Sequence, residues 1–148
     1  MRPITAAFAA LLLASPAWAD TSRAEQPAKP GEDTSGRIQR GEASYYHPRF
    51  HGRQMANGER FDARSNSAAS RTLPLGTTAL VRNLETGQMA MVEIEDRGPY
   101  AANRVLDVSP KTAEKLGMKQ DGTAPVEIAP VQVPQPDGTL KPGAGARR

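Results

Sequence analysis

TTALVRNLETGQMAMVEIE, residues 77–95, decides the fold class of this chain. Two runs, Thr77–Leu84 and Gln88–Glu95, flank the short connection Glu85-Thr86-Gly87. A glycine at that place supplies the left-handed backbone that a three-residue hairpin connection needs. Because alternate residues of a strand face opposite sides of a sheet, one parity of the second run is expected to face a core. That parity is wholly aliphatic: Ala90, Val92 and Ile94. The stretch therefore predicts a β-hairpin with one buried face.

Outside the hairpin, short strands and one helix are indicated. Composition predicts short strands at Glu42–Tyr46, Arg104–Val108 and Ala124–Ile128. For the helix, Ser109 is a suitable N-cap, Pro110 fits the first helical position and Gly117 fits the position after the last turn. Ala113 and Leu116 are then expected to pack inward. Several short strands, one brief helix and Gly-rich connections indicate a small closed β-barrel.

The chain of 148 residues has room for one domain, which we place at 40–131. The segments 20–39 and 132–148 are polar, contain Pro and Gly, and lack apolar periodicity, so they predict a disordered linker and a disordered tail. Residues 1–19 have the pattern of a secretory signal peptide, with Arg2 before a short apolar run and small residues at the cleavage point. The run falls short of the roughly 20 residues that span a bilayer. We therefore expect export to the periplasm.

Composition excludes several classes of function. The sequence contains no cysteine, so disulfides, thiol chemistry, thiolate metal sites and lipidation of a leader cysteine are excluded. We expect neither a lipid anchor nor stable membrane insertion. The net charge is +3, but eleven Lys and Arg balance eleven Asp and Glu between residues 41 and 131, so the domain needs no basic face. We expect no nucleic-acid partner. Two histidines without cysteine make no credible metal site, and no cofactor is predicted.

Four segments carry a family resemblance: GEASYYHPRFHGRQMANGERFD (41–62), RTLPLGT (71–77), VEIEDRGPY (92–100) and RVLDVSPKTAEKLGM (104–118). In this order they resemble the successive motifs of RlpA-type lytic transglycosylases. The resemblance implies a mainly β fold, a small six-stranded double-psi β-barrel with one or two short helices and a groove across one face. It also implies a lyase that cuts the MurNAc–GlcNAc bond within naked peptidoglycan strands and leaves 1,6-anhydroMurNAc ends. Peptidoglycan glycan strands are then the partner, with cell-division or wall-remodelling proteins beside them, and we expect a monomer.

The resemblance places the family's two functional carboxylates on Glu59 and Asp96. Lytic transglycosylation needs a general acid for the leaving oxygen and a base for the C6 hydroxyl of the same MurNAc, and one carboxyl can serve both steps. Asp96 directly follows an apolar strand, and partial burial would keep it protonated near neutral pH. We therefore predict Asp96 as the acid/base and Glu59 as the stabiliser of the oxocarbenium-like state, with exchanged roles as the alternative. Arg97 would oppose the effect of burial if its guanidinium lay close.

Six residues are predicted to contact the substrate: Ser70, His51, Asn57, Arg97, Asp107 and Tyr100. Ser70 replaces the family's histidine, and a serine cannot titrate near neutral pH, so this member either keeps only a positioning role there or is slow or inactive. His51 is either a substitute for that histidine or a hydrogen-bonded turn residue, and Asn57 also belongs to a common Asn-Gly turn signal. Asp107 is either a third groove carboxylate or a cap of the following turn. Tyr100, like Tyr46 and Phe50, either stacks on sugar rings or fills the core.

Two other classes of function compete with the enzyme. A non-catalytic, expansin-like barrel that binds or loosens the glycan is the first, because the missing histidine fits a binding role. An inhibitor or scaffold protein is the second, and in that class the tail 132–148 would be the working part.

Overall fold

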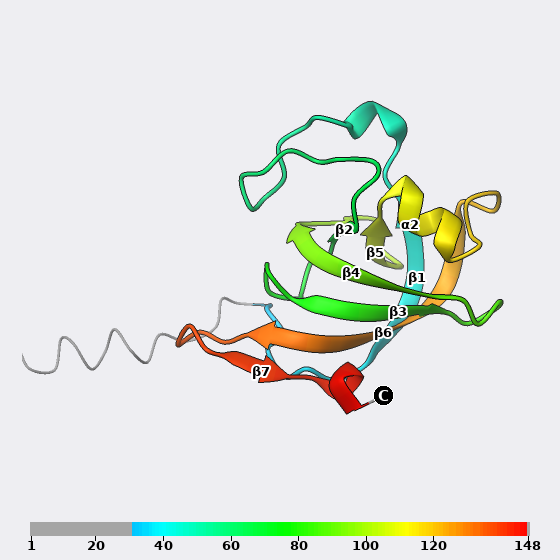
Figure 1. The fold of residues 1–148 in the computed structure, drawn as a ribbon. Helices are drawn as coiled ribbons and strands as arrows, with labels where there is room; N and C mark the ends of the chain where they lie inside the picture. Colours follow the sequence, from blue (N-terminus) through cyan, green and yellow to red (C-terminus); the bar gives the residue numbers. More distant parts are fainter. Residues whose placement is uncertain (1–30, 148) are drawn as a thin grey trace, which may run out of the picture.

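The computed structural model describes residues 31–147, so the predicted signal peptide and the first part of the predicted linker lie outside it. The elements follow one another as β1 (Gln39–Tyr45), η1 (Pro48–Phe50), β2 (Ser67–Ala69), β3 (Thr78–Asn83), β4 (Met89–Asp96), β5 (Arg104–Val108), α2 (Pro110–Lys115), β6 (Thr123–Pro134), β7 (Leu140–Pro142) and η2 (Ala144–Arg147) (Figure 1). Within this range no helix is long and apolar enough to cross a membrane.

Six strands close into a barrel. Their order is β1-β5-β2-β4-β3-β6, and β1 also pairs with β6, which completes the ring. The β1–β5 and β2–β4 pairs are parallel and the other pairs are antiparallel. Closure pairs each of the six strands with a neighbour on both of its edges. The predicted mainly β, six-stranded barrel is confirmed.

The predicted hairpin is present as β3 and β4, with Ala79 opposite Val92 and Val81 opposite Ala90. All four of these side chains are buried, together with Ile94, and they form part of one aliphatic core. The opposite parity faces outward, since the side chains of Met89 and Met91 are exposed. The alternation that predicted the buried face is confirmed.

The predicted helix is also present. The Ser109 hydroxyl accepts a hydrogen bond from the backbone N–H of Thr112 at 3.1 Å, as an N-cap does. Gly117 has a φ of +70° just after the helix, and Ala113 and Leu116 are fully buried.

Strand β6 is longer than the predicted run Ala124–Ile128. It continues through Pro130 to Pro134 because a register irregularity between Thr78 and Ala79 of β3 lies beside Pro130. A proline has no N–H to donate to a ladder, so strands tolerate it at such irregularities and at edges.

The predicted disorder of 132–148 is wrong for the described residues, 132–147. Strand β7 pairs with the end of β6, and η2 packs beside it (Figure 1). The glycines that suggested flexibility are instead sites of close packing: a Cβ on Gly143 would lie 2.3 Å from the Pro130 carbonyl oxygen, and one on Gly145 would lie 2.4 Å from that of Ala129.

The predicted linker is likewise ordered where the structure describes it, at residues 31–39. The backbone N–H of Asp33 donates to the carbonyl of Thr72 at 2.7 Å, and the N–H of Ala144 donates to the carbonyl of Gly36 at 2.9 Å. Backbone groups of this polar segment are therefore hydrogen-bonded to the barrel and to the C-terminal segment.

Candidate active site

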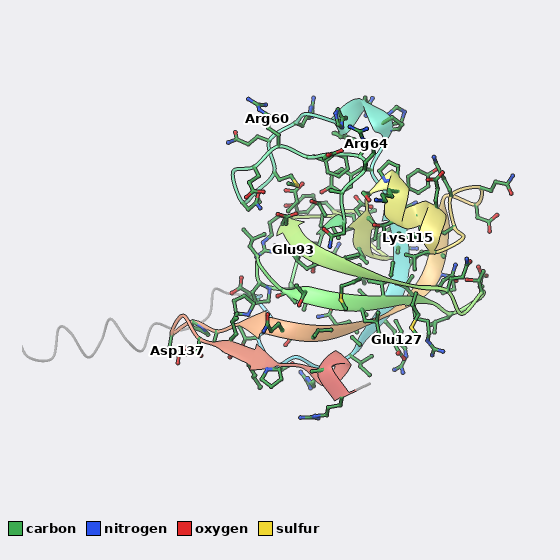
Figure 2. The ribbon with its side chains drawn as sticks, viewed as in Figure 1. Arg60, Arg64, Glu93, Lys115, Glu127 and Asp137 are labelled. Carbon is green, nitrogen blue, oxygen red and sulfur yellow. The ribbon has the colours of Figure 1, made fainter. Side chains whose placement is uncertain are left out.

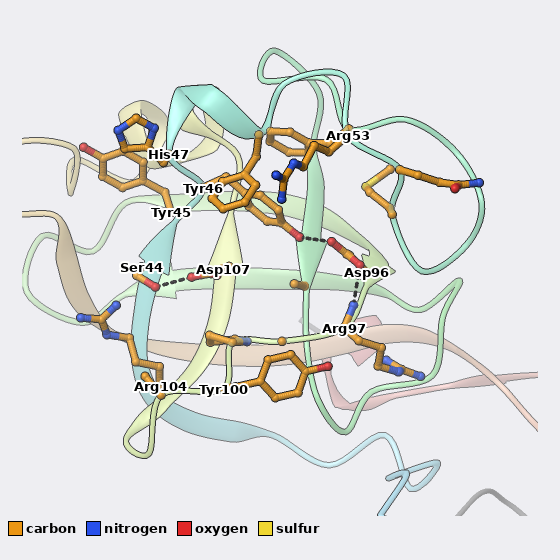
Figure 3. A pocket seen from close by; sticks show the side chains of 18 residues that line it. Ser44, Tyr45, Tyr46, His47, Arg53, Asp96, Arg97, Tyr100, Arg104 and Asp107 are labelled. Carbon is orange, nitrogen blue, oxygen red and sulfur yellow. Dashed lines mark hydrogen bonds between the residues drawn. The ribbon is translucent and has the colours of Figure 1, made fainter.

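A cavity of about 560 Å³ lies beside the ends of strands β1, β4 and β5 (Figure 3). Ser44 and Tyr45 of β1, Asp96 of β4 and Asp107 of β5 contribute to one side. The connection after β1 contributes an aromatic and basic side, with Tyr46, His47, Phe50, Arg53 and Phe61. The connection between β4 and β5 supplies Arg97 to Ala101, so three separate stretches of the chain meet there.

Asp96, the last residue of β4, has both carboxylate oxygens occupied by donors. The Tyr46 hydroxyl donates to one oxygen at 2.6 Å. The backbone N–H groups of Ala56 and Arg97 donate to the other, each at 2.9 Å. Three donors converging on one carboxylate complement its negative charge.

Tyr46 is fixed as a donor to Asp96. Burial first, and then the hydrogen bond to Asp96 and the charges of Asp96 and Asp107, raise the pKa of the Tyr46 phenol. Its ring stacks on Phe61 with centroids 4.2 Å apart and meets Phe50 edge-on at 6.1 Å. The Tyr46 and Phe50 rings therefore pack against other aromatic residues while they line the cavity.

Asp107 is the second carboxyl in the cavity. It lies opposite Ser44 in the parallel β1–β5 pair, and the Ser44 hydroxyl donates a hydrogen bond to it (Figure 3). Burial raises the pKa of Asp107 and the nearby Asp96 charge adds to this, while the Ser44 hydrogen bond and Arg104 act in the opposite direction. Asp107 is thus the carboxyl of this cavity whose surroundings favour the protonated form.

Arg97 contributes its backbone to Asp96 but directs its charge elsewhere. Its Nη1 donates to the carbonyls of Ser70 at 3.0 Å and Leu73 at 2.7 Å, and its Nη2 pairs with Glu32 at 3.1 Å. The guanidinium therefore does not pair with the Asp96 carboxylate.

Tyr100 lies at the open side of the cavity. Its side chain is 77% exposed, so the core-filling alternative is wrong for this residue, and its ring is free to meet a ligand.

Glu59 and Asn57 lie in the connection between β1 and β2 and do not line the cavity. The tip of this connection rests on the end of β4, because Asn57 donates from its backbone to the Glu95 carbonyl and from its amide to the Glu95 carboxylate. Glu59 is exposed, and its backbone N–H donates to the Asn57 side chain. Its negative charge acts on Glu93: burial first, and then the charges of Glu95 and Glu59, raise the pKa of Glu93. Glu59 of the β1–β2 connection thus lies near the end of β4 where Asp96 is found, although only Asp96 lines the cavity.

Two other predicted contact residues have structural partners instead. The Ser70 side chain is 1% exposed, and its hydroxyl accepts from the backbone N–H groups of Thr72 and Leu73. The His51 Nδ1 accepts from the backbone N–H of Ala63 at 3.1 Å, as the turn alternative requires. Neither residue lines the cavity.

Sequence reasoning did not select Ser44, Arg53 or Arg104, which do line the cavity. Ser44 and Arg104 lie inside two of the quoted motifs. Their proximity to Asp107 depends on the parallel pairing of β1 with β5, two strands far apart in the chain, and no local pattern reports that pairing.

Comparisons with known proteins agree with this fold. A family model described as "Lytic transglycolase" matches residues 38–128. The probable endolytic peptidoglycan transglycosylase RlpA of Synechocystis sp. is 42% identical over 99 residues, which cover 67% of this chain and 31% of that protein. The RlpA proteins of Aquifex aeolicus (49% over 88 residues, 60% of this chain and 39% of that one) and Neisseria meningitidis serogroup A (37% over 90 residues, 61% and 38%) also match. The chain thus spans between about three and four tenths of the length of these curated relatives.

Two solved structures share the fold at low identity. The Streptomyces papain inhibitor aligns with a TM-score of 0.52 at 22% identity, over 64% of this chain and 94% of that one. The Clavibacter michiganensis expansin aligns with a TM-score of 0.51 at 18% identity, over 66% of this chain and 52% of that one. At such identities the likeness extends to the fold alone.

Proposed function

This chain belongs to the lytic transglycolase family, with an RlpA-type double-psi β-barrel, and from that premise we propose that it cleaves the MurNAc–GlcNAc bond of peptidoglycan by lytic transglycosylation. One observation carries the proposal: two carboxyl groups, Asp96 and Asp107, line one cavity in opposite environments. Asp96 accepts three hydrogen bonds, whereas burial raises the pKa of Asp107. Glycosidic cleavage commonly divides its acid and anion roles between two carboxyl groups of one site.

Asp107 is proposed as the acid/base. It gives its proton to the bridging oxygen as the bond from MurNAc C1 to that oxygen breaks. The C6 hydroxyl oxygen of the same MurNAc then bonds to C1, and its proton passes to the Asp107 carboxylate. The enzyme returns to its starting protonation state, and the product end is 1,6-anhydroMurNAc. Neither water nor a covalent enzyme intermediate takes part.

Asp96 is proposed as the anion that stabilises positive charge developing on the sugar ring. Its three donors hold the carboxylate in one orientation, so it needs no reorganisation when the charge appears. This exchanges the role that the sequence analysis gave to Asp96. The reason is that Asp96, although it ends an apolar strand, is not buried without partners. The β1–β2 connection lies against it and supplies hydrogen-bond donors to its carboxylate.

Glu59 is proposed as a residue that meets the glycan from the β1–β2 connection. The backbone N–H of Ala56, three positions before Glu59, donates to the Asp96 carboxylate, so a hydrogen bond joins this connection to the proposed anion. Ser70 and His51 support the same region through their backbone contacts and are not proposed to touch the sugar.

The cavity is suited to a glycan strand that enters at one side and leaves at the other. A second cavity of about 600 Å³ shares Ser44, Tyr45, His47 and Arg104 with the first. Tyr100 offers an exposed aromatic face at the other boundary. This arrangement supports an endolytic cut, and peptide-free strands in the periplasm are the proposed substrate and location.

The test is digestion of peptide-free glycan strands with the purified protein, followed by mass spectrometry of the products. The proposal requires 1,6-anhydroMurNAc ends that disappear with Asp96→Asn. Binding to the strands without any anhydro product would favour the expansin-like, non-catalytic alternative.

A further inference from the structure

Glu32 lies before residue 38, where the family match begins, and in the segment that the sequence predicts to be disordered. Its carboxylate nevertheless pairs with the Arg97 guanidinium at 3.1 Å. The side chains are only 17% and 27% exposed, so solvent screens this pair weakly. A contact from outside the region matched by the family model thus reaches the residue that follows Asp96.

The Arg97 side chain is held away from Asp96 by three acceptors. Two are the carbonyls of Ser70 and Leu73, which are neutral, and the third is the Glu32 carboxylate, which is the one charged partner. Figure 3 shows the backbone of Arg97 bonded to Asp96 while its side chain extends in another direction. Arg97 therefore donates to Asp96 through its neutral backbone N–H, while its charged guanidinium binds other acceptors.

The segment that carries Glu32 is itself fixed at several points. The Asp33 backbone N–H donates to the Thr72 carbonyl, in the same turn that accepts from Arg97. The Gln135 amide donates to the Thr34 carbonyl at 3.1 Å, and the Ala144 N–H donates to the Gly36 carbonyl. Glu32 is therefore presented to Arg97 by contacts with both the barrel and the C-terminal segment.

We propose that Glu32 is a positioning residue for Asp96: it holds the Arg97 guanidinium against the Ser70–Leu73 turn and balances its charge. Among the described residues, Asp96 then meets only neutral donors, from Tyr46 and Ala56 in the β1–β2 connection and from the Arg97 backbone. The other charged side chains that line the cavity are Asp107 and Arg104 on β5 and Arg53 in the β1–β2 connection, and Arg104 acts on Asp107. Without the Glu32 charge, the half-buried Arg97 cation loses its carboxylate partner and is left beside Asp96, its neighbour in sequence, where pairing would offset the charge of the proposed anion. The consequence for catalysis rests on the proposed function, but the electrostatic effect does not.

The electrostatic effect is measured without substrate, by following the ¹³C signal of the Asp96 carboxyl against pH in the full chain. In Glu32→Gln the titration midpoint of Asp96 should fall by about one pH unit, because a nearby cation favours the carboxylate. Asp137→Asn, in the exposed turn between β6 and β7 (Figure 2), is the matched control and should leave the midpoint unchanged. An unchanged midpoint in folded Glu32→Gln overturns the proposal.

A second pair of variants covers the case in which Glu32→Gln does not fold. The double variant Glu32→Gln/Arg97→Gln contains neither charge, so no unpaired ion is buried. Its Asp96 midpoint should equal that of Arg97→Gln alone, since Glu32 acts through Arg97. A further fall in the double variant would contradict this. Because these readouts need no turnover, they fail independently of the anhydro-product assay that tests the proposed function.

Discussion

The Tyr46 hydroxyl donates to the Asp96 carboxylate at 2.6 Å and joins the start of the β1–β2 connection to the end of β4. The two residues are fifty positions apart in the chain. The contact makes the aromatic wall of the cavity and its proposed anion one unit, because the Tyr46 ring stacks on Phe61 while its oxygen binds Asp96.

Tyr46→Phe should slow the formation of anhydro product by about ten-fold to a hundred-fold. The change removes one donor to a charged group, worth about 1.5–3 kcal/mol, and each 1.4 kcal/mol of barrier corresponds to about ten-fold in rate. The stacking on Phe61 is retained, so the variant should still fold, with an unfolding temperature lowered by the loss of the same hydrogen bond. Single-turnover rates and thermal unfolding check the two statements; a loss of fold with an unchanged rate per folded molecule would contradict them.

Ser44→Ala should move the alkaline limb of the pH–rate profile to higher pH. The Ser44 hydrogen bond lowers the pKa of Asp107 against the effect of burial, so its removal raises that pKa further. An acid catalyst is active while protonated, and activity is lost as pH rises through its pKa. The limb therefore shifts upward. Rates measured across the pH range, with Thr139→Ala as a hydroxyl-loss control in the C-terminal turn, test this, and a downward shift would exclude Asp107 as the acid.

Ser70→Ala should lower stability more than it alters glycan cleavage. The Ser70 hydroxyl accepts two backbone N–H groups at a buried position, and a buried donor left unsatisfied costs about 1–3 kcal/mol. Urea unfolding measures that loss, and the rate per folded molecule should stay within a few-fold of the parent. A large loss of rate at unchanged stability would show that Ser70 acts on the substrate.

The fold was predictable where local patterns determine it. The alternation in Gln88–Glu95 and the capping signals at Ser109 and Gly117 correspond to the observed β4 and α2. Strand β2 was missed because Ser67–Ala69 is three residues long and has no β-branched or aromatic side chain. The ordered C-terminal segment was missed because its glycines serve close packing against β6, which composition does not distinguish from flexibility.

The candidate site was predictable in part as a set of residues, and not as a division of roles. Of the predicted residues, Asp96, Arg97, Tyr100 and Asp107 line the cavity, whereas Glu59, Asn57, Ser70 and His51 do not. Asp96 and Asp107 both belong to motifs that the sequence displays. Which of them is covered by donors and which is buried depends on the β1–β2 connection folding over β4 and on the parallel β1–β5 pair. Both are long-range features, so the chain around each aspartate does not report them.

The rate of 1,6-anhydroMurNAc release by Asp107→Asn, on peptide-free strands at a fixed near-neutral pH, tests the assignment of the proton donor most directly. The account predicts a loss of about a hundred-fold or more, as expected when a general acid is removed, with the fold retained and with Asp137→Asn as active as the parent. Release by Asp107→Asn at the parental rate would contradict it.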